Sequence, residues 1–351
     1  MSLAIGDAGR VVDTAAVRAL APVDAIRSAL LRALVGVFRP FAADRDARIA
    51  LLAIVSIAFA LALTGVAPLW LLAVAPIVLG VPHLAADLRY LVARPRLHRR
   101  GWAWLVVGLP LAATWIWPHA WVGLFASLGA ITLAGGTLGR KALVLALWSV
   151  AFLAAWRFGH RADVVLAQAH NVVAFVLFAI LFGRGRWRTV TLIAGAFVAA
   201  SLAIFAGALD DLFVRAHGWE APATGLDLDG LVATLSPVRD PALGVRWVLF
   251  FAFAQSVHYA IWVRLVPEAA REKPGMRPFA SSYRALVRDL GRPLVVGLAL
   301  VAAALVVYAL VDLRASRDAY LRLAVFHGHL EIAALALFAA EGTRARAGRT
   351  C

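Results

Sequence analysis

The sequence predicts an all-α polytopic integral membrane protein, a helical bundle of about ten transmembrane helices. Two compositional observations predict this class: 63% of the 351 residues are hydrophobic with only 16% charged, and the mean hydropathy is +0.83. A soluble globular domain is typically about half apolar and about a quarter charged. The third observation is that the apolar residues gather in runs of roughly 17–25 residues, the length that crosses a bilayer as a helix.

The chain begins with a polar leader over residues 1–48, which carries seven Arg and no cleavable apolar core, so we expect no signal peptide. We expect this leader to be cytoplasmic, and 23–38 to be suited to lie on the membrane as an interfacial helix. A transmembrane bundle over 49–340 follows, and then a cytoplasmic tail over 341–351. The predicted spans are 49–66, 68–93, 101–117, 119–137, 141–157, 161–182, 187–209, 243–265, 292–312 and 318–340.

The placement of Lys and Arg predicts the orientation of these spans, because cytoplasmic loops are enriched in both residues. With the N-terminus inside, the inside segments hold 26 of the 35 cations and the outside segments hold 8. We therefore predict a multi-pass protein of the cell membrane with both termini cytoplasmic. The outside connection 210–242 is acidic and predicts a solvated loop or a small lid. The inside connection 266–291 is basic and rich in Pro, which predicts an irregular surface segment.

The net charge of +15 and the single cysteine narrow the function classes. The cations lie mostly in short loops and no aromatic-basic binding module accompanies them, so the lipid bilayer rather than nucleic acid is the expected partner. Cys351 alone cannot form an intramolecular disulfide or a Cys-rich metal site. The sequence also lacks a nucleotide-binding loop, a Gly-x-Ser-x-Gly elbow and a CxxCH haem attachment.

Four predicted spans carry a histidine far from their ends, which is costly in hydrocarbon and usually marks a protein interior. These residues are His83, His170, His258 and the pair His327 and His329. All four spans run in the same direction, so their depths are comparable. At about 1.5 Å per residue, two of the histidines lie roughly 22 Å below the outer boundary and the others roughly 12–15 Å below it. One shared site and two stacked layers are both compatible with these depths.

The helical period indicates which polar groups face the same way. His83 and Asp87 are four residues apart and share a face, as do His327 and Glu331. His329 points almost opposite to His327, so we choose His327. Metal-bound imidazoles need hydrogen-bond partners that fix their tautomer. We predict a metal held by His83, His170, His258 and His327 and supported by Asp87, Glu331, Gln255 and Asn171.

One of these stretches resembles the Brp/Blh-type bacterial β-carotene dioxygenases, whose signature is Gly-hydrophobic-Pro-His-Gly-Ala-x-Asp. The matching residues are Gly80-Val81-Pro82-His83 and Asp87, with Leu84 where the family usually has Gly. The resemblance implies a polytopic enzyme that cleaves a carotenoid with non-haem iron and dioxygen, giving retinal. It further implies that His83 is an iron ligand with Asp87 beside it, and that the other three histidines stand in for the remaining ligands.

The preferred hypothesis is therefore a membrane metalloenzyme with Fe(II), dioxygen and an apolar small-molecule substrate. The chemistry of the donor atoms alone does not distinguish iron from zinc or copper. A second hypothesis is an electron-transfer protein that binds b-type haem through opposed histidines, His83 with His258 or His170 with His329. A third is a transporter or non-catalytic membrane protein with a buried His/Asp/Glu path, which the prolines Pro76 and Pro82 within one span favour.

Overall fold

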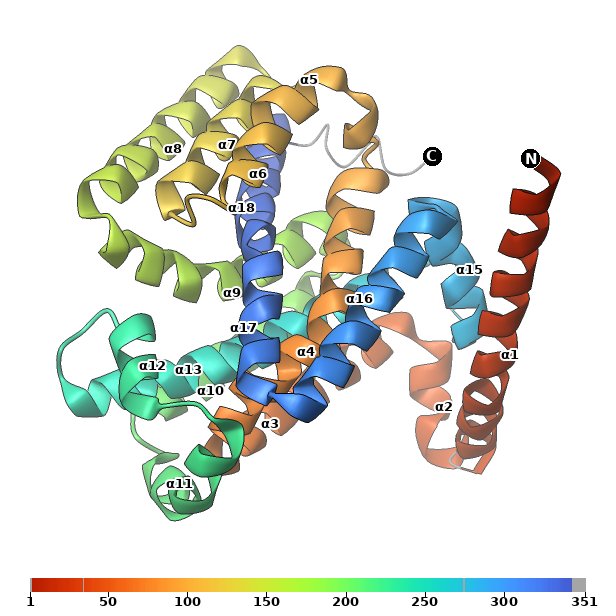
Figure 1. Cartoon of the computed structure of the whole chain (residues 1–351), viewed down its shortest axis with the longest axis horizontal. Helices are drawn as coiled ribbons and strands as arrows, with labels where there is room; N and C mark the ends of the chain where they lie inside the picture. Colours follow the sequence, from red (N-terminus) through yellow and green to blue (C-terminus); the bar gives the residue numbers. More distant parts are fainter. Residues whose placement is uncertain (1, 34, 274, 343–351) are drawn as a thin grey trace.

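The computed structural model describes residues 2–33, 35–273 and 275–342, and over these ranges the chain is helical and contains no strand. About 86% of it is helix. Figure 1 shows long helices packed side by side and joined by short connections. The prediction of an all-α polytopic membrane bundle is confirmed.

Eight helical segments in the described ranges are long and apolar enough to span a membrane. They match eight of the ten predicted spans, with ends that differ by a few residues. Three of them are composites, in which a π-helical turn or a kink joins successive helices. The eight are α3 (Arg45–Val66), α4 with η1 (Pro68–Asp87, Leu88–Ala93), α8 (Leu138–Phe158), α9 (His160–Phe182), α10 (Trp187–Phe205), α13 with η4 and α14 (Pro241–Ala260, Ile261–Leu265, Val266–Ala269), α16 (Arg292–Val311) and α17 with α18 (Leu313–Leu323, Val325–Glu341).

The third and fourth predicted spans are shorter than expected. The chain forms α5 (Gly101–Ala103), η3 (Trp104–Gly108) and α6 (Leu109–Ala113), and then α7 (Ala120–Thr132). Pro118 disfavours helical backbone at Trp117, the residue before it, so α6 cannot continue into α7 as one helix. The non-helical pair Gly135-Gly136 follows the end of α7. At about 1.5 Å per residue, helices of this length span only part of the hydrocarbon core.

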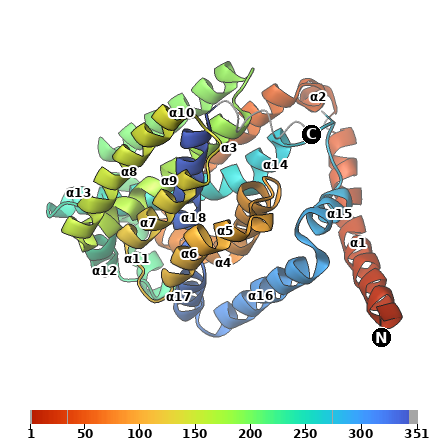
Figure 2. The same ribbon diagram turned by 90° about the horizontal axis from the view of Figure 1, so that it is seen from above.

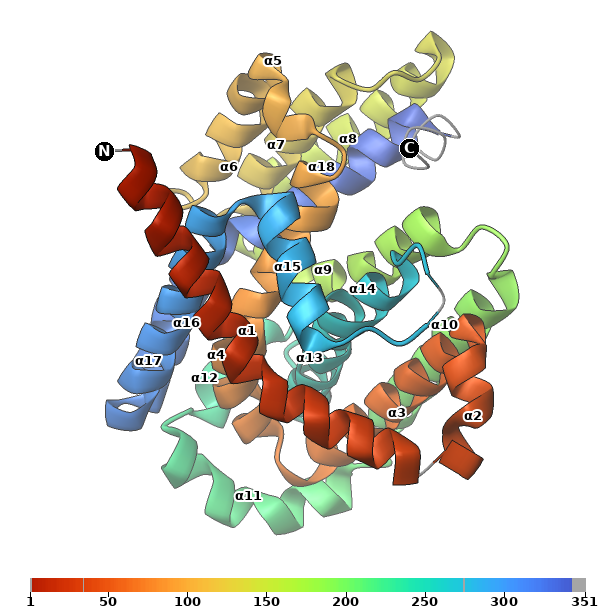
Figure 3. The same ribbon diagram turned by 90° about the vertical axis from the view of Figure 1, so that its right-hand side faces the viewer.

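The connections contain more helix than expected. The acidic outside connection forms α11 (Asp210–Thr224) and α12 (Leu228–Leu235). The prediction of an irregular segment over 266–291 was wrong over α15 (Phe279–Leu290). Its first two N–H groups are capped by Asp24, at 2.7 and 3.1 Å, and these caps come from the other end of the sequence. The leader itself forms α1 (Ser2–Ala33) and α2 (Val35–Ala43), and α1 lies along α15 at the edge of the bundle (Figure 3).

Three segments lie at the centre of the bundle: α4, α13 and α18. Between 61% and 78% of their most apolar stretch is buried, compared with 11% for α8 and α16. Figure 2 shows α18 and α4 enclosed by the other helices, while α16 and α1 lie on the outside. Side chains in the middle of the three central helices are therefore removed from both water and lipid, and these helices carry three of the four predicted metal ligands.

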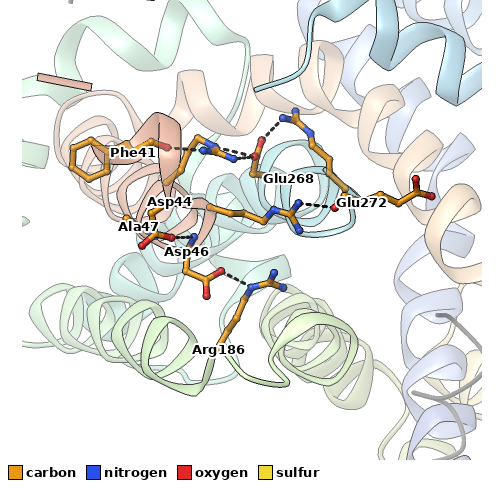
Figure 4. Close-up of polar contacts among 10 residues, drawn as sticks. Phe41, Asp44, Asp46, Ala47, Arg186, Glu268 and Glu272 are labelled. Atoms are coloured by element: carbon orange, nitrogen blue, oxygen red, sulfur yellow. Dashed lines mark hydrogen bonds and ion pairs between the residues drawn. The ribbon is translucent and has the colours of Figure 1, made fainter. Parts of the chain in front are cut away.

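Polar contacts gather at two opposite ends of the spans and agree with the predicted alternation. At one end, Arg186 pairs with Asp46 and Arg45 reaches the carbonyl of Glu272, which joins segments predicted to be inside (Figure 4). At the other end, Arg246 pairs with Asp210 at 2.7 Å. Which end faces the cytoplasm stays a prediction. The predicted tail falls, from residue 343 on, outside the described residues.

Candidate metal centre

The centre of the site is the C-terminal end of α4, where His83 and Asp87 lie one turn apart on the same helical face. Both side chains are completely buried. The helix stays continuous through its two internal prolines and then widens into the π-helical turn η1 directly after Asp87. Such π-helical turns are rare and are frequent at functional sites. A second one, η4, follows His258 by three residues on α13.

Gly80, one turn before His83, lets another helix approach closely. A Cβ atom at this position would overlap the phenol ring of Tyr320 on α17. Tyr320 is fully buried, so its ring cannot swing away without disturbing the packing. The glycine of the sequence signature is therefore explained by this contact between α4 and α17.

Donor atoms from α4, α13 and α18 meet within hydrogen-bond range of one another. Nε2 of His83 lies 2.9 Å from Nε2 of His258 and 3.3 Å from Oδ2 of Asp87. Oε1 of Glu331 lies 3.2 Å from Nε2 of His258 and 3.4 Å from Nε2 of His83. Residues that are far apart in the sequence thus form one compact polar cluster.

His170 on α9 and His327 on α18 complete this cluster. The ring of His327 lies 4.9 Å from that of His83, and the ring of His170 lies 5.3 Å from that of His258 and 5.5 Å from that of His327. Both residues keep some accessible surface, whereas His83 is sealed. The side of the cluster formed by His170 and His327 is therefore its open side. We name His83, Asp87, His170, His258, His327 and Glu331 the central cluster.

The backbone fixes the tautomer of these two histidines. Nδ1 of His170 donates to the carbonyl of Ala167 at 2.7 Å, and Nδ1 of His327 donates to the carbonyl of Ala324 at 2.5 Å. A carbonyl can only accept, so the proton is on Nδ1 and the Nε2 lone pair is free. Ala324 is the kink between α17 and α18. This is the arrangement that orients histidines for a metal ion.

The charge balance of the cluster calls for a cation or for protons. In the described part of the chain no Arg or Lys pairs with Asp87 or Glu331, although both are fully buried. Neither oxygen of Asp87 makes a hydrogen bond. Two buried carboxylates with only imidazoles beside them are strongly destabilising when ionised, so they must share protons or bind a positive ion.

The residues fit a first-row metal ion. Ligands at about 2.1 Å from such an ion lie roughly 3.0 Å apart in an octahedral arrangement and roughly 3.4 Å apart in a tetrahedral one. The four donor distances above, from 2.9 to 3.4 Å, fall in this range. Two sets of three donors that could hold an ion occur in the described residues, one with three histidines and one with His83 and the two carboxylates. The presence of a metal stays a prediction.

The remaining predicted residues lie at different distances from the cluster. Asn171 is buried beside His170, and its amide donates to the same Ala167 carbonyl at 3.3 Å. Gln255 is buried on α13, one turn before His258. His329 points away, and its Nδ1 lies against Gly123 of α7, where a Cβ would collide with it. Of the two histidines on α18, His327 is thus the one in the cluster.

Aromatic side chains of α13 and η4 lie beside His83. The ring of Tyr259 lies 5.2 Å and that of Trp262 lies 6.4 Å from the ring of His83. Tyr320, which sequence reasoning missed, contacts Gly80 from α17. The sequence signals for these aromatic residues were weak. Tyr259 directly follows His258, and Gly80 of the signature indicates only that some other side chain approaches α4 closely.

An apolar cavity of about 250 Å³ lies between η1, the segment from α5 to α6, α7 and α18. Its wall includes Leu91, four residues after Asp87, and Leu330, directly before Glu331. Trp104 and Trp115 line it as well and are about 60% exposed. The cavity is smaller than pockets that enclose drug-sized ligands, at roughly 300–1,000 Å³, so a long apolar molecule would extend out of it.

The geometry bears on the two alternative hypotheses. Axial ligands on opposite sides of a haem iron lie about 4 Å apart at metal–nitrogen distances of about 2.0 Å. Nε2 of His83 and Nε2 of His258 are only 2.9 Å apart. The helix that carries Pro76 and Pro82 is also continuous rather than broken. The pair His83 and His258 is therefore too close to hold a haem between them, while the pair His170 and His329 and the transporter stay hypotheses.

Comparison of the chain with protein-family models, with curated proteins and with solved structures found no match. What the structure itself establishes is a polytopic helical protein with a buried His/Asp/Glu cluster that could hold a metal ion.

Proposed function

We propose that this protein is a membrane metalloenzyme, a non-haem iron dioxygenase that cleaves a carotenoid-like apolar substrate. One observation carries the proposal: four histidines and two carboxylates from four helices form a cluster deep in a membrane bundle, and no Arg or Lys among the described residues pairs with it. His-rich ligation supported by carboxylates suits iron that reacts with dioxygen. The signature around His83, which resembles the β-carotene dioxygenases, supports the same chemistry.

In this proposal the four imidazoles hold the ion and the carboxylates balance its charge. The carbonyls of Ala167 and Ala324 keep Nε2 of His170 and His327 available as donors. Iron at this site would supply the activation of dioxygen, whose two oxygen atoms end up in the two carbonyl products of a cleaved carbon–carbon double bond. Tyr259 and Trp262 exclude water from the sealed side of the cluster.

The apolar cavity supports an apolar substrate. Its lining is almost entirely hydrocarbon, and it lies between α18 and the η1 end of α4. A substrate dissolved in the bilayer could therefore enter sideways, between Trp104 and Trp115, without crossing water.

The test is the metal content of detergent-purified protein after iron-supplemented expression, measured for wild type and for single His→Ala variants of the four histidines. His160→Ala is the matched control, because this histidine is exposed at the start of α9. We expect stoichiometric iron in wild type and the control and a large loss in each of the four variants. Asp87→Asn should cost about 10–100-fold in affinity if the carboxylate only supports a ligand.

Activity is then measured by incubating the iron-loaded protein with β-carotene under air and under nitrogen and quantifying retinal by chromatography. Retinal formed only under air supports the proposal. Wild type without stoichiometric metal contradicts the metalloenzyme, and iron without any cleavage product contradicts the dioxygenase. A reduced-minus-oxidised spectrum of haem type would favour electron transfer instead.

A further inference from the structure

A second cavity, of about 480 Å³, is lined by basic residues, unlike the apolar cavity described above. It lies at the end of the bundle that the charge pattern predicts to be cytoplasmic. It is formed by the η1 end of α4 and by the segment from α14 to α15. We name it the basic pocket. Its cationic lining residues are Arg89, Arg94, Arg271, Lys273, Arg277 and Arg288.

The positive charge of the basic pocket is only partly neutralised. Asp289 accepts from Arg89 at 2.7 Å and from Arg94 at 3.2 Å, and Glu268 pairs with Arg271 at 2.9 Å. Glu272 is the one acidic residue among those that line the pocket. These three carboxylates can balance at most three of the six cations, so about three positive charges remain.

The carboxylate of Asp289 is already committed to its arginines. Burial opposes its ionisation, but Arg89 and Arg94 outweigh this and hold the pKa of Asp289 below its ordinary value. The carboxylate is therefore ionised and paired: its Oδ2 accepts from Arg89 and Arg94, and its Oδ1 lies 3.6 Å from Nε of Arg288. Arg277 and Lys273 project from the connection between α14 and α15, and Arg288 projects from α15 itself.

Buried ion pairs fix the walls of the basic pocket. Arg48 on α3 donates to Glu268 at 2.7 and 2.9 Å and to the carbonyl of Phe41 at 2.6 Å, which ties α14 to α2 and α3 (Figure 4). On the other wall, the guanidinium groups of Arg89 and Arg94 lie 5.2 and 5.0 Å from the ring centre of Tyr90. The charges are thus held around a preformed cavity rather than scattered over a surface.

We propose that the basic pocket binds a phosphate-bearing ligand. Guanidinium groups match phosphate oxygens in a bidentate fashion, and the hydroxyl-bearing Ser281 and Ser282 line the same cavity. The first N–H groups of α15 are already capped by Asp24, so the basic side chains and not the helix terminus would hold the anion. The phosphate belongs to an anionic lipid headgroup or to a soluble phosphorylated molecule, and the test separates the two.

The test uses full-length protein in nanodiscs of neutral phosphatidylcholine. In one arm, pyrophosphate is titrated calorimetrically as the soluble probe. In the other, phosphatidic acid is added to the nanodiscs, and native mass spectrometry counts the anionic lipid retained by the protein. Saturable pyrophosphate binding identifies a soluble ligand, and retention of phosphatidic acid alone identifies a headgroup; either outcome supports the proposal.

The double variant Arg277→Gln with Arg288→Gln removes two cations of the pocket. Arg288 is 72% exposed and lies 3.6 Å from Asp289, and its loss leaves the shorter pairs of Asp289 with Arg89 and Arg94 in place. We expect the double variant to weaken binding by at least about tenfold, the size expected for losing a charge-assisted hydrogen bond. Arg284→Gln is the matched control, because Arg284 lies exposed on α15 and does not line the pocket. Gel filtration and melting curves check that the variants fold. Equal weakening in the control, or no saturable binding of either probe, overturns the proposal.

Discussion

Replacing Gly80 with alanine tests the closest helix contact at the site. The added Cβ would lie inside the van der Waals envelope of two ring carbons and the hydroxyl oxygen of Tyr320, so either the ring or α17 must shift. Overpacking of a well-packed interior typically costs about 1–3 kcal/mol. At roughly 2 °C per kcal/mol for a chain larger than 150–250 residues, the melting temperature should fall by about 2–6 °C.

The assay is thermal unfolding of detergent-purified protein, followed by intrinsic fluorescence. Gly195→Ala on α10 is the matched control, because a Cβ there meets no atom within 4 Å. It should be neutral or raise stability by about 0.5–1 kcal/mol, as expected for a glycine in the middle of a helix. The double variant with Tyr320→Ala should be no less stable than Tyr320→Ala alone, since the clash is then removed. Unchanged stability of Gly80→Ala, or additive losses in the double variant, would refute the reasoning.

Three further predictions follow from the site and the topology. His327→Ala should remove bound metal while His329→Ala retains most of it, because only His327 lies in the central cluster; equal losses would contradict this geometry. Asp289→Asn should lower the melting temperature at pH 7. Its lowered pKa gives stability that is present above the unfolded value of about 3.9 and lost as the pH falls through the folded value, so the difference should vanish in acid; a constant difference would argue against the ion pairs. A reporter fused after Arg100 should signal cytoplasm and one within 215–240 the outside, and swapped signals would reverse the orientation.

The sequence by itself determined the fold class and most of the spans. Apolar length is a local property, and a helix that crosses lipid must satisfy its own backbone, so composition predicted eight membrane-length helices closely. The facing of His327 with Glu331 also followed from the helical period alone. The shortness of α7, and the helix α15 capped by Asp24, did not follow from local apolarity.

Only the tertiary structure decided that the four histidines share one place. Depths counted along straight helices differ by about 10 Å between the two groups of histidines. The kink at Ala324, the π-helical turns after Asp87 and His258, and the approach of Tyr320 to Gly80 all change the path of the central helices near the cluster. The last of these is a contact between residues far apart in the chain. Helical periodicity determines which way a side chain faces, but the packing of one helix on another determines what it meets.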